Sequence, residues 1–347
     1  MMRAVVFEGP GSVAVRDVPE PELLGADDAI VRVTLSAICG SDLHFLHGKT
    51  PMDPGDILGH EAVGVVDAVG AGVMRVRPGD RVVISFDIAC GDCWYCGTGM
   101  SALCDRSQMF GGGPFTGSVP GAQAERVRVP RADVNLLRVP DSLEDERALF
   151  LGDVLTTGFY AASLGGIRVG DTVAVVGAGP LGFFCAQAAA SLEPARVCVV
   201  DPDPGRLALV ASTGATPVDP ATRHPQMAAA EVTDGRGADV VIEAVGSADA
   251  FTSAVSIVRP GGTVVVAGVY AGETAEIQLG LYWTRALDLR FTGLCPIHAW
   301  WGQAMQAVVD ERLHPLPLIS HRLPLEDAAA GYALFDRREA TKVVLRP

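Results

Sequence analysis

Residues 173–182 of the chain read VAVVGAGPLG, and this stretch decides one half of the fold. Its glycines follow a run of β-branched residues and precede an apolar run with helical spacing. In this order the first glycine permits a tight turn, the second lets the backbone approach a pyrophosphate, and the third allows close packing of helix on strand. Free N–H groups at the start of the helix then bind the anion. The stretch therefore predicts a strand, a turn and a helix that bind a dinucleotide through Gly177, Gly179, Pro180, Leu181 and Gly182.

A second predicted strand, RVCVVD, ends in Asp201, nineteen residues after Gly182. A carboxylate at this distance can reach a ribose 2′-hydroxyl and repels a 2′-phosphate, so NAD(H) is favoured over NADP(H). Arg206 lies close by in the sequence and is expected along the cofactor, although its charge would partly offset a phosphate. The alternative is a parallel sheet whose glycine loop binds nothing, since glycine-rich turns between strand and helix are common.

The pattern changes near residue 150. Before it, short β-branched runs alternate with Gly and Pro turns, which is typical of a β-rich, barrel-like domain. After it, strand and helix patterns alternate, as a parallel βαβ sheet requires. We therefore predict an α/β chain with a β-rich domain at 1–152, a doubly wound domain at 153–288, and a return of 289–347 to the first domain.

The charge of the chain excludes several classes of partner. Its 347 residues include 41 acids against 27 bases, a net charge of −14. Such a surface repels phosphate backbones and anionic lipid headgroups, so we expect neither nucleic acid nor membrane as a partner. The start of the chain has no long apolar segment, and later apolar runs are interrupted by Gly and Pro. We expect a cytoplasmic protein whose thiols stay reduced.

Half of the eight cysteines lie in fifteen residues with the spacing C-x2-C-x2-C-x7-C, namely Cys90, Cys93, Cys96 and Cys104. Four thiolates satisfy the tetrahedral preference of Zn²⁺ and leave no position open for water or substrate. An iron–sulfur cluster is the competing interpretation, but clusters of that kind have other spacings. A nucleic-acid-binding zinc ribbon would need basic residues that this loop lacks. The loop is therefore expected to be a structural zinc site.

A different set of metal-binding residue types is spread over three segments: CGSDLH (39–44), GHE (59–61) and FLGDVLTTG (150–158). One thiolate, one imidazole and one carboxylate would form a three-ligand zinc site with an open fourth position, the arrangement of catalytic zinc. Spacing alone does not select these residues, because ligands far apart in the sequence cannot be brought together by inspection.

A family resemblance does select them. The motifs CGSDLH, GHE followed by GVVDAVG, GDRV before the four cysteines, VGAGPLG and the terminal KVVLRP occur in this order. Together they resemble the zinc-dependent medium-chain alcohol dehydrogenase family over nearly the whole chain. The resemblance implies a GroES-like catalytic domain and a Rossmann cofactor domain, with the active site in the cleft between them. It also implies two zinc ions per chain.

The resemblance assigns Cys39, His60 and Asp153 as ligands of the catalytic zinc. Asp153 matches a position where liver-type enzymes have Cys and several bacterial enzymes for secondary alcohols, polyols or formaldehyde have an acid. Glu61 matches an acid that can bind the zinc when water leaves or ligands exchange.

The remaining assignments concern the proton and the cofactor. Ser41 matches the hydroxyl that touches the substrate oxygen, and His44 the far end of a proton relay. Asp42 would orient a ligand histidine. Gly40 stands where some relatives place a base against the pyrophosphate, so helix amides or Lys342 would supply that contact.

The implied activity is hydride transfer between NAD(H) and an alcohol/carbonyl pair, with a secondary alcohol, polyol or sugar-like alcohol as substrate. One alternative is a formaldehyde-type enzyme that oxidises or dismutates aldehydes. Another is a non-catalytic dinucleotide-binding protein, which would not need an open metal site. The partner is a small molecule. The family implies a homodimer or homotetramer, and the apolar segment RFTGLCPI (290–297) is a candidate for its interface.

Overall fold

The computed structural model describes residues 1–270, 272 and 274–347 of the chain. These divide into two compact units. Unit 1 comprises Met1–Asp153, Pro296–Val309 and Ile319–Pro347, and unit 2 comprises Val154–Cys295 and Asp310–Leu318. Unit 2 extends past the predicted boundary at 289 because strand β15 (Asp288–Phe291) belongs to its sheet.

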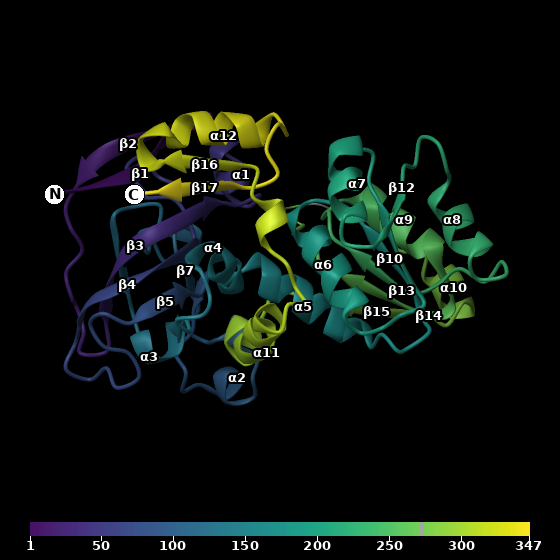
Figure 1. The fold of residues 1–347 in the computed structure, drawn as a ribbon, viewed down its shortest axis with the longest axis horizontal. Coiled ribbons are helices and arrows are strands. Elements are labelled where there is room, and N and C mark those ends of the chain that lie inside the picture. Colours follow the sequence, from purple (N-terminus) through teal and green to yellow (C-terminus); the bar gives the residue numbers. More distant parts are fainter. Residues whose placement is uncertain (271, 273) are drawn as a thin grey trace. The chain divides into compact units, whose positions relative to one another are not determined.

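Unit 1 is built around a mainly antiparallel sheet of seven strands, shown in Figure 1. The strand order is β16–β17–β3–β4–β5–β9, with β8 also paired to β3. The strands are β3 (Ala29–Ile38), β4 (Glu61–Val69), β5 (Arg81–Ile84), β8 (Arg126–Val129), β9 (Leu136–Arg138), β16 (His321–Pro324) and β17 (Val343–Arg346). Their Val, Ile and Ala side chains are largely buried, so the β-branched runs in the sequence form the core of this unit.

Smaller elements complete unit 1. Two hairpin-like pairs are β1 (Met2–Gly9) with β2 (Ser12–Val18), and β6 (Asp87–Ile88) with β7 (Gln108–Met109). Its α-helices are α1 (Asp42–Leu46), α2 (Trp94–Gly97), α3 (Ala132–Asn135), α4 (Asp145–Ala148), α11 (Ile297–Val309) and α12 (Ala328–Asp336). Its 3-10 turns are η1 (Ser101–Leu103), η2 (Pro114–Thr116), η3 (Leu149–Gly152) and η5 (Leu325–Asp327). Helix α12 packs on β16 and β17, at the yellow end of the ribbon in Figure 1.

Unit 2 is a parallel sheet of six strands in the order β12–β11–β10–β13–β14–β15. The strands are β10 (Thr172–Val176), β11 (Arg196–Val200), β12 (Thr216–Val218), β13 (Ala238–Glu243), β14 (Val258–Val266) and β15. The helices are α5 (Val154–Gly165), α6 (Pro180–Ala190), α7 (Pro204–Ala211), α8 (Pro225–Glu231), α9 (Ala248–Ile257) and α10 (Leu279–Thr284), with the 3-10 turn η4 (Leu316–Leu318). The strand order reverses between β10 and β13, and ligands of such sheets bind at the carboxyl ends of the strands at this point.

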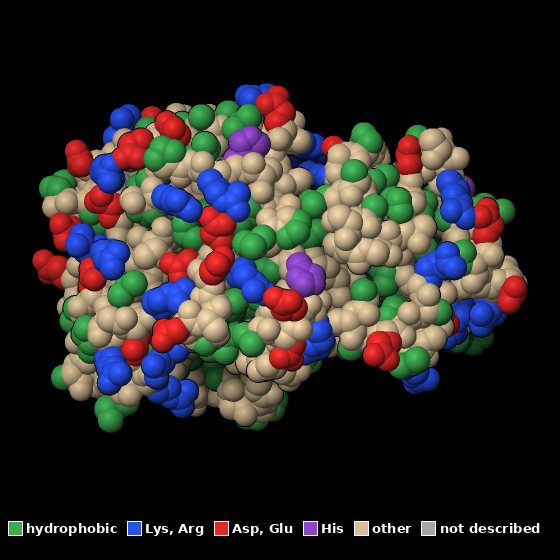
Figure 2. All heavy atoms as spheres, in the orientation of Figure 1, with side chains coloured by type: hydrophobic (Ala, Val, Ile, Leu, Met, Phe, Trp, Pro, Cys, Tyr) green, Lys and Arg blue, Asp and Glu red, His purple; other side chains and the backbone are tan. Residues whose placement is uncertain are grey.

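The predicted α/β fold class, with a β-rich domain and a doubly wound domain, is confirmed. On the face drawn in Figure 2, acidic and basic side chains are mixed over unit 1 rather than gathered by sign. No single helix among the described residues is long and apolar enough to cross a membrane. A bent pair, Asp145–Gly152 with Val154–Gly165, passes that test jointly, by length and composition alone.

Candidate active site and metal centres

The four-cysteine cluster, Cys90, Cys93, Cys96 and Cys104, lies on the loop around α2 and η1. The four sulfur atoms all lie within 4.8 Å of one another. Backbone N–H groups support them: Cys90 N donates to Cys104 Sγ over 3.2 Å, and Cys93 N to Cys90 Sγ over 3.4 Å. The backbone N–H groups of Cys96 and Asp105 lower the pKa of Cys93 to about 6, whereas burial raises the pKa of Cys96 to about 12. The four soft donors around one point fit a tetrahedral zinc with no open position.

A buried histidine fastens this loop to the rest of unit 1. His298, on α11, lies 2.9 Å from Ser101 Oγ through Nδ1 and 2.9 Å from Asn135 Oδ1 through Nε2. Asn135 in turn exchanges hydrogen bonds with the backbone of Ala89, the residue before the first cysteine. Burial lowers the pKa of His298 to about 4, so the ring is neutral at pH 7. The sequence did not indicate this contact, because α11 lies about two hundred residues beyond the loop.

The three-donor centre, Cys39, His60 and Asp153, is brought together by the sheet. Cys39 follows β3 and His60 precedes β4, and the β3–β4 register places Ala37 opposite Glu61. Asp153 follows η3. His60 Nε2 lies 3.4 Å from Asp153 Oδ2, and Cys39 Sγ lies 3.8 Å from the same oxygen. The three predicted ligands therefore converge on one point.

The electrostatics of the three-donor centre favour a cation. His60 is 1% exposed, and burial alone would lower its pKa. The charges of Asp42 and Cys39 outweigh burial, so the pKa of His60 lies well above its ordinary value. Surroundings that draw a proton onto a buried imidazole also attract a metal ion. Together with the sulfur, nitrogen and oxygen donors, they fit zinc with one position left for another ligand.

The predicted relay residues lie next to this centre. Ser41 Oγ is 3.3 Å from His60 Nε2 and 3.4 Å from Cys39 Sγ. His44 is half-buried one helical turn further on, in α1. Burial, helped by Lys49 and His47, lowers the pKa of His44 below its ordinary value. Ser41 is thus at the donor atoms, and His44 lies in the helix that begins directly after it.

Glu61 and Lys342 form an ion pair in the interior of unit 1, and both side chains are 0% exposed. Burial raises the pKa of Glu61. Burial alone would lower the pKa of Lys342, but Glu61 outweighs it and the pKa is raised. Lys342 was expected to contact the cofactor. Within unit 1 its ammonium group lies against the acid beside His60, and we find no signal in the sequence for this pair.

The predicted dinucleotide site lies within unit 2 and has the expected local geometry. Gly177 has φ of +100°, and a Cβ there would lie 2.6 Å from a methyl group of Val245. A Cβ on Gly182 would overlap the carbonyl oxygen of Gly177, so the helix can approach the strand only with glycine there. At Gly179 the nearest atom to a Cβ would be Arg206 Nη1 at 3.9 Å, which leaves room for a ligand.

Asp201 lies against the same turn. It is 6% exposed, at the carboxyl end of β11. Its Oδ2 accepts a hydrogen bond from Ala178 N over 2.7 Å, and its Oδ1 accepts one from Asp203 N over 2.8 Å. Helix α6 begins directly after the turn, with Pro180 and Leu181 in its first turn. The glycine turn, the acid and Arg206 are thus neighbours in unit 2, as the spacing predicts.

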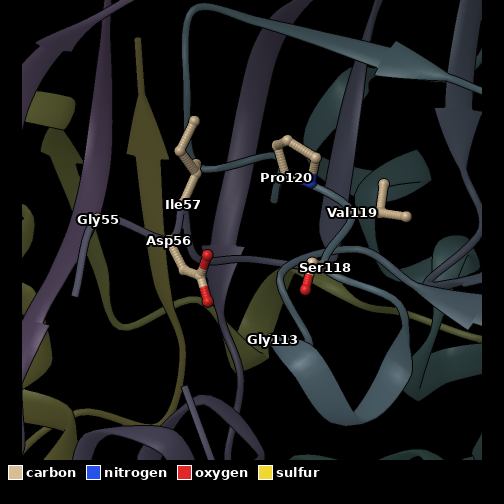
Figure 3. Close-up of a pocket in the computed structure, with 7 residues that line it drawn as sticks. All are labelled: Gly55, Asp56, Ile57, Gly113, Ser118, Val119 and Pro120. Carbon is tan, nitrogen blue, oxygen red and sulfur yellow. The ribbon is translucent and has the colours of Figure 1, made fainter. Parts of the chain in front are cut away.

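A separate cavity of about 110 Å³ opens between two loops of unit 1 (Figure 3). It is lined by Gly55, Asp56, Ile57, Gly113, Ser118, Val119 and Pro120. None of the residues predicted to bind metal or cofactor is among them.

Comparisons with known proteins agree with this arrangement. Residues 25–141 match the family described as alcohol dehydrogenase GroES-like domain, and residues 180–310 the family described as zinc-binding dehydrogenase. The zinc-type alcohol dehydrogenase-like protein AdhB of Bacillus subtilis (strain 168) is 37% identical, with 100% of both chains covered.

Among solved structures, alcohol dehydrogenase TADH from Thermus sp. ATN1 is 44% identical, with 99% of each chain covered and a TM-score of 0.95. A zinc-binding dehydrogenase candidate from Sinorhizobium meliloti 1021, bound to NADP, is 32% identical over 100% of this chain and 99% of its own, with a TM-score of 0.88. The chain is a zinc-dependent oxidoreductase that uses a nicotinamide cofactor. It belongs to the zinc-dependent medium-chain alcohol dehydrogenase family.

Proposed function

We propose that the chain interconverts an alcohol and its carbonyl compound with NAD(H), at a zinc ion held by Cys39, His60 and Asp153. The observation that carries the proposal is the convergence of one thiol, one imidazole and one carboxylate within 4.8 Å. A zinc ion bound there would act as a Lewis acid that lowers the pKa of an alcohol or polarises a carbonyl. A second zinc, in the four-cysteine cluster, would be structural.

The residues around the centre have distinct tasks in this proposal. Ser41 Oγ, beside two of the donor atoms, would accept the hydroxyl proton of the substrate while its own proton passes to the cofactor ribose and from there to His44. His44 passes that proton to solvent, because its lowered pKa keeps the ring neutral and able to accept one at pH 7. Asp42 holds His60 through Nδ1, over 3.3 Å. Glu61, beside His60, is a reserve ligand, and Lys342 balances its charge while it stays away from the metal.

The preference for NAD(H) over NADP(H) rests on Asp201. Its carboxylate lies against the glycine turn, where it can accept a hydrogen bond from a ribose hydroxyl and would repel a 2′-phosphate. Arg206 is near enough to Gly179 to pair with a phosphate, and the Sinorhizobium relative was solved with NADP. The choice between the two cofactors is therefore decided by the balance of these two side chains.

The substrate class we propose is a secondary alcohol, polyol or sugar-like alcohol, since Asp153 replaces a thiolate as third ligand. We place the enzyme in the cytoplasm because none of the eight cysteines, all of which the structure describes, forms a disulfide. We also propose a homodimer or homotetramer. Trp283 in α10 and Phe291 in the edge strand β15 are 83% and 61% exposed, and we propose that these large apolar side chains lie in the interface between protomers.

The test combines metal analysis with turnover. Protein purified without added metal should contain about two zinc ions per chain. It should also reduce NAD⁺ faster than NADP⁺ when given a panel of secondary alcohols and polyols. A dismutating enzyme would convert aldehyde to equal amounts of acid and alcohol with no net NADH. About one zinc per chain, with dinucleotide binding but no turnover on any substrate, would refute the proposal in favour of a binding protein.

A further inference from the structure

Four buried side chains form a row that starts at the three-donor centre and ends in helix α12; its first contact is an ion pair and the other two are hydrogen bonds. His60 Nδ1 lies 3.3 Å from Asp42 Oδ1. Gln123 Nε2 donates to Asp42 Oδ2 over 3.1 Å, and the Tyr332 hydroxyl donates to Gln123 Oε1 over 2.9 Å. Each of the four side chains is at most 1% exposed. Water therefore does not compete for these bonds.

The amide of Gln123 can point only one way. Its nitrogen faces two acceptors, Asp42 Oδ2 and the carbonyl oxygen of Ala37, each at 3.1 Å. A flipped amide would place its oxygen against both of them and its NH₂ group against the Tyr332 hydroxyl. The Ala37 carbonyl oxygen, which can only accept, thus fixes which atom of Gln123 meets Asp42, and the hydrogen bond from Tyr332 holds the amide in that orientation.

Asp42 is consequently held by donors on one of its oxygens. Oδ2 accepts from Gln123 Nε2 and from Cys39 N, the latter over 3.0 Å. Oδ1 is left to face Nδ1 of His60, where a carboxylate favours the tautomer with the proton on Nδ1. The Nε2 lone pair of His60 then points to Cys39 and Asp153, as a metal ligand requires.

Backbone packing fixes Gln123 independently of these bonds. Gly59, next to His60, has φ of +95°, and a Cβ there would collide with Cγ of Gln123. Gln123 N donates to Leu58 O over 2.9 Å, and Ala122 N donates to Gly59 O over 2.8 Å. The segment that carries Gln123 therefore lies directly on the segment that carries the ligand histidine.

We propose that Gln123 and Tyr332 are positioning residues of the catalytic metal centre. Tyr332 orients the amide of Gln123, Gln123 holds Asp42, and Asp42 keeps His60 in the tautomer and rotamer that bind the metal. The inference rests on the proposed function, because it requires a metal ion at Cys39, His60 and Asp153. It predicts that removing a single hydroxyl in α12 changes how long the metal stays bound.

The experiment measures zinc release to an excess of chelator, resolved into the phases of the two zinc sites. Tyr332→Phe and Gln123→Met should each speed release from the three-donor centre by roughly 10- to 100-fold, the range found for such outer partners of metal ligands. Release from the four-cysteine cluster should not change. Tyr270→Phe is the matched control, because it removes a tyrosine hydroxyl bonded to the buried carboxylate of Glu243 in unit 2. It should leave both phases unchanged.

A cobalt-substituted centre gives a second readout. If Gln123 and Tyr332 position His60, the visible spectrum of cobalt bound at the three-donor centre changes in both variants, because the ligand field changes. If they only fill the core, melting temperature falls while release rates and spectra stay as in the unchanged protein, and the inference is refuted. If the unchanged protein holds only one zinc per chain, in the four-cysteine cluster, both the proposed function and this inference fail.

Discussion

The four-cysteine cluster and the three-donor centre lie in the same unit but are built in opposite ways. The cluster takes its donors from one loop, and backbone N–H groups of that loop support the sulfur atoms. The three-donor centre takes its donors from three segments, with Cys39 and Asp153 114 residues apart, and relies on buried side chains such as Asp42. A closed site can be encoded locally. The open site of this chain needs the folded sheet, because the register of β3 and β4 brings Cys39 and His60 together.

The largest expected effect is the loss of turnover when a donor of the three-donor centre is removed. His60→Ala removes a ligand of the three-donor centre and should lower kcat/KM by about 10³-fold or more, since Lewis-acid stabilisation is worth several kcal/mol. Dinucleotide affinity, measured by fluorescence titration, and the zinc of the four-cysteine cluster should remain. His321→Ala, in β16, is the control. Turnover close to that of the control would show that His60 takes no part in the reaction. The two sites would then not differ as a catalytic and a structural site.

A smaller effect on turnover is expected when the four-cysteine cluster is disrupted. Cys93→Ser should remove one zinc per chain and lower Tm by about 10 °C, because a structural zinc contributes folding free energy. Below the melting transition, kcat should stay within about threefold of the original, since this cluster has no open position. The control is Cys198→Ala, in β11, which should keep both zinc ions. Lost turnover with unchanged Tm would mean that the cluster takes part in catalysis.

The smallest effect concerns pH. Burial lowers the pKa of His298 to about 4 in the folded chain, whereas an unperturbed histidine has a pKa of about 6.5. Between these two pH values the unfolded chain therefore binds one proton more than the folded chain. Stability should therefore be lost as pH falls through this window, by up to about 3 kcal/mol at its lower end. His298→Gln does not titrate, so its free energy of unfolding should depend less steeply on pH. Denaturant titrations from pH 4.5 to 7 would test this, and parallel curves for the two proteins would contradict it.

The two sites also differ in how far the sequence predicted them. The spacing of Cys90 to Cys104 and the glycines of 177–182 could be interpreted directly, because each motif lies within one short segment. The ligands Cys39, His60 and Asp153 could be chosen only through the family resemblance.

The side chains around the three donors could be predicted neither from motif spacing nor from the family resemblance. Gln123 meets Asp42 from 81 residues further along the chain, and Lys342 meets Glu61 from near the other end of the chain. Such partners depend on packing between distant segments, and no spacing rule describes it. The family resemblance predicted that Lys342 contacts the cofactor. Its burial against Glu61 was found only in the structure.

The place of β17 in the sheet has a consequence for how the enzyme is made. This strand lies between β16 and β3, with Val343 opposite Ile38. On the ribosome, β3 emerges early but must wait for some 300 further residues before this neighbour exists, roughly 15–60 s at ordinary rates of translation. Residues 154–295 of unit 2 are synthesised in the meantime. Until β17 is made, the end of β3 from Ser36 to Ile38 lacks its partner strand on that edge, and Glu61 lacks its lysine. The surroundings of the three-donor centre are therefore among the last parts of unit 1 to be completed.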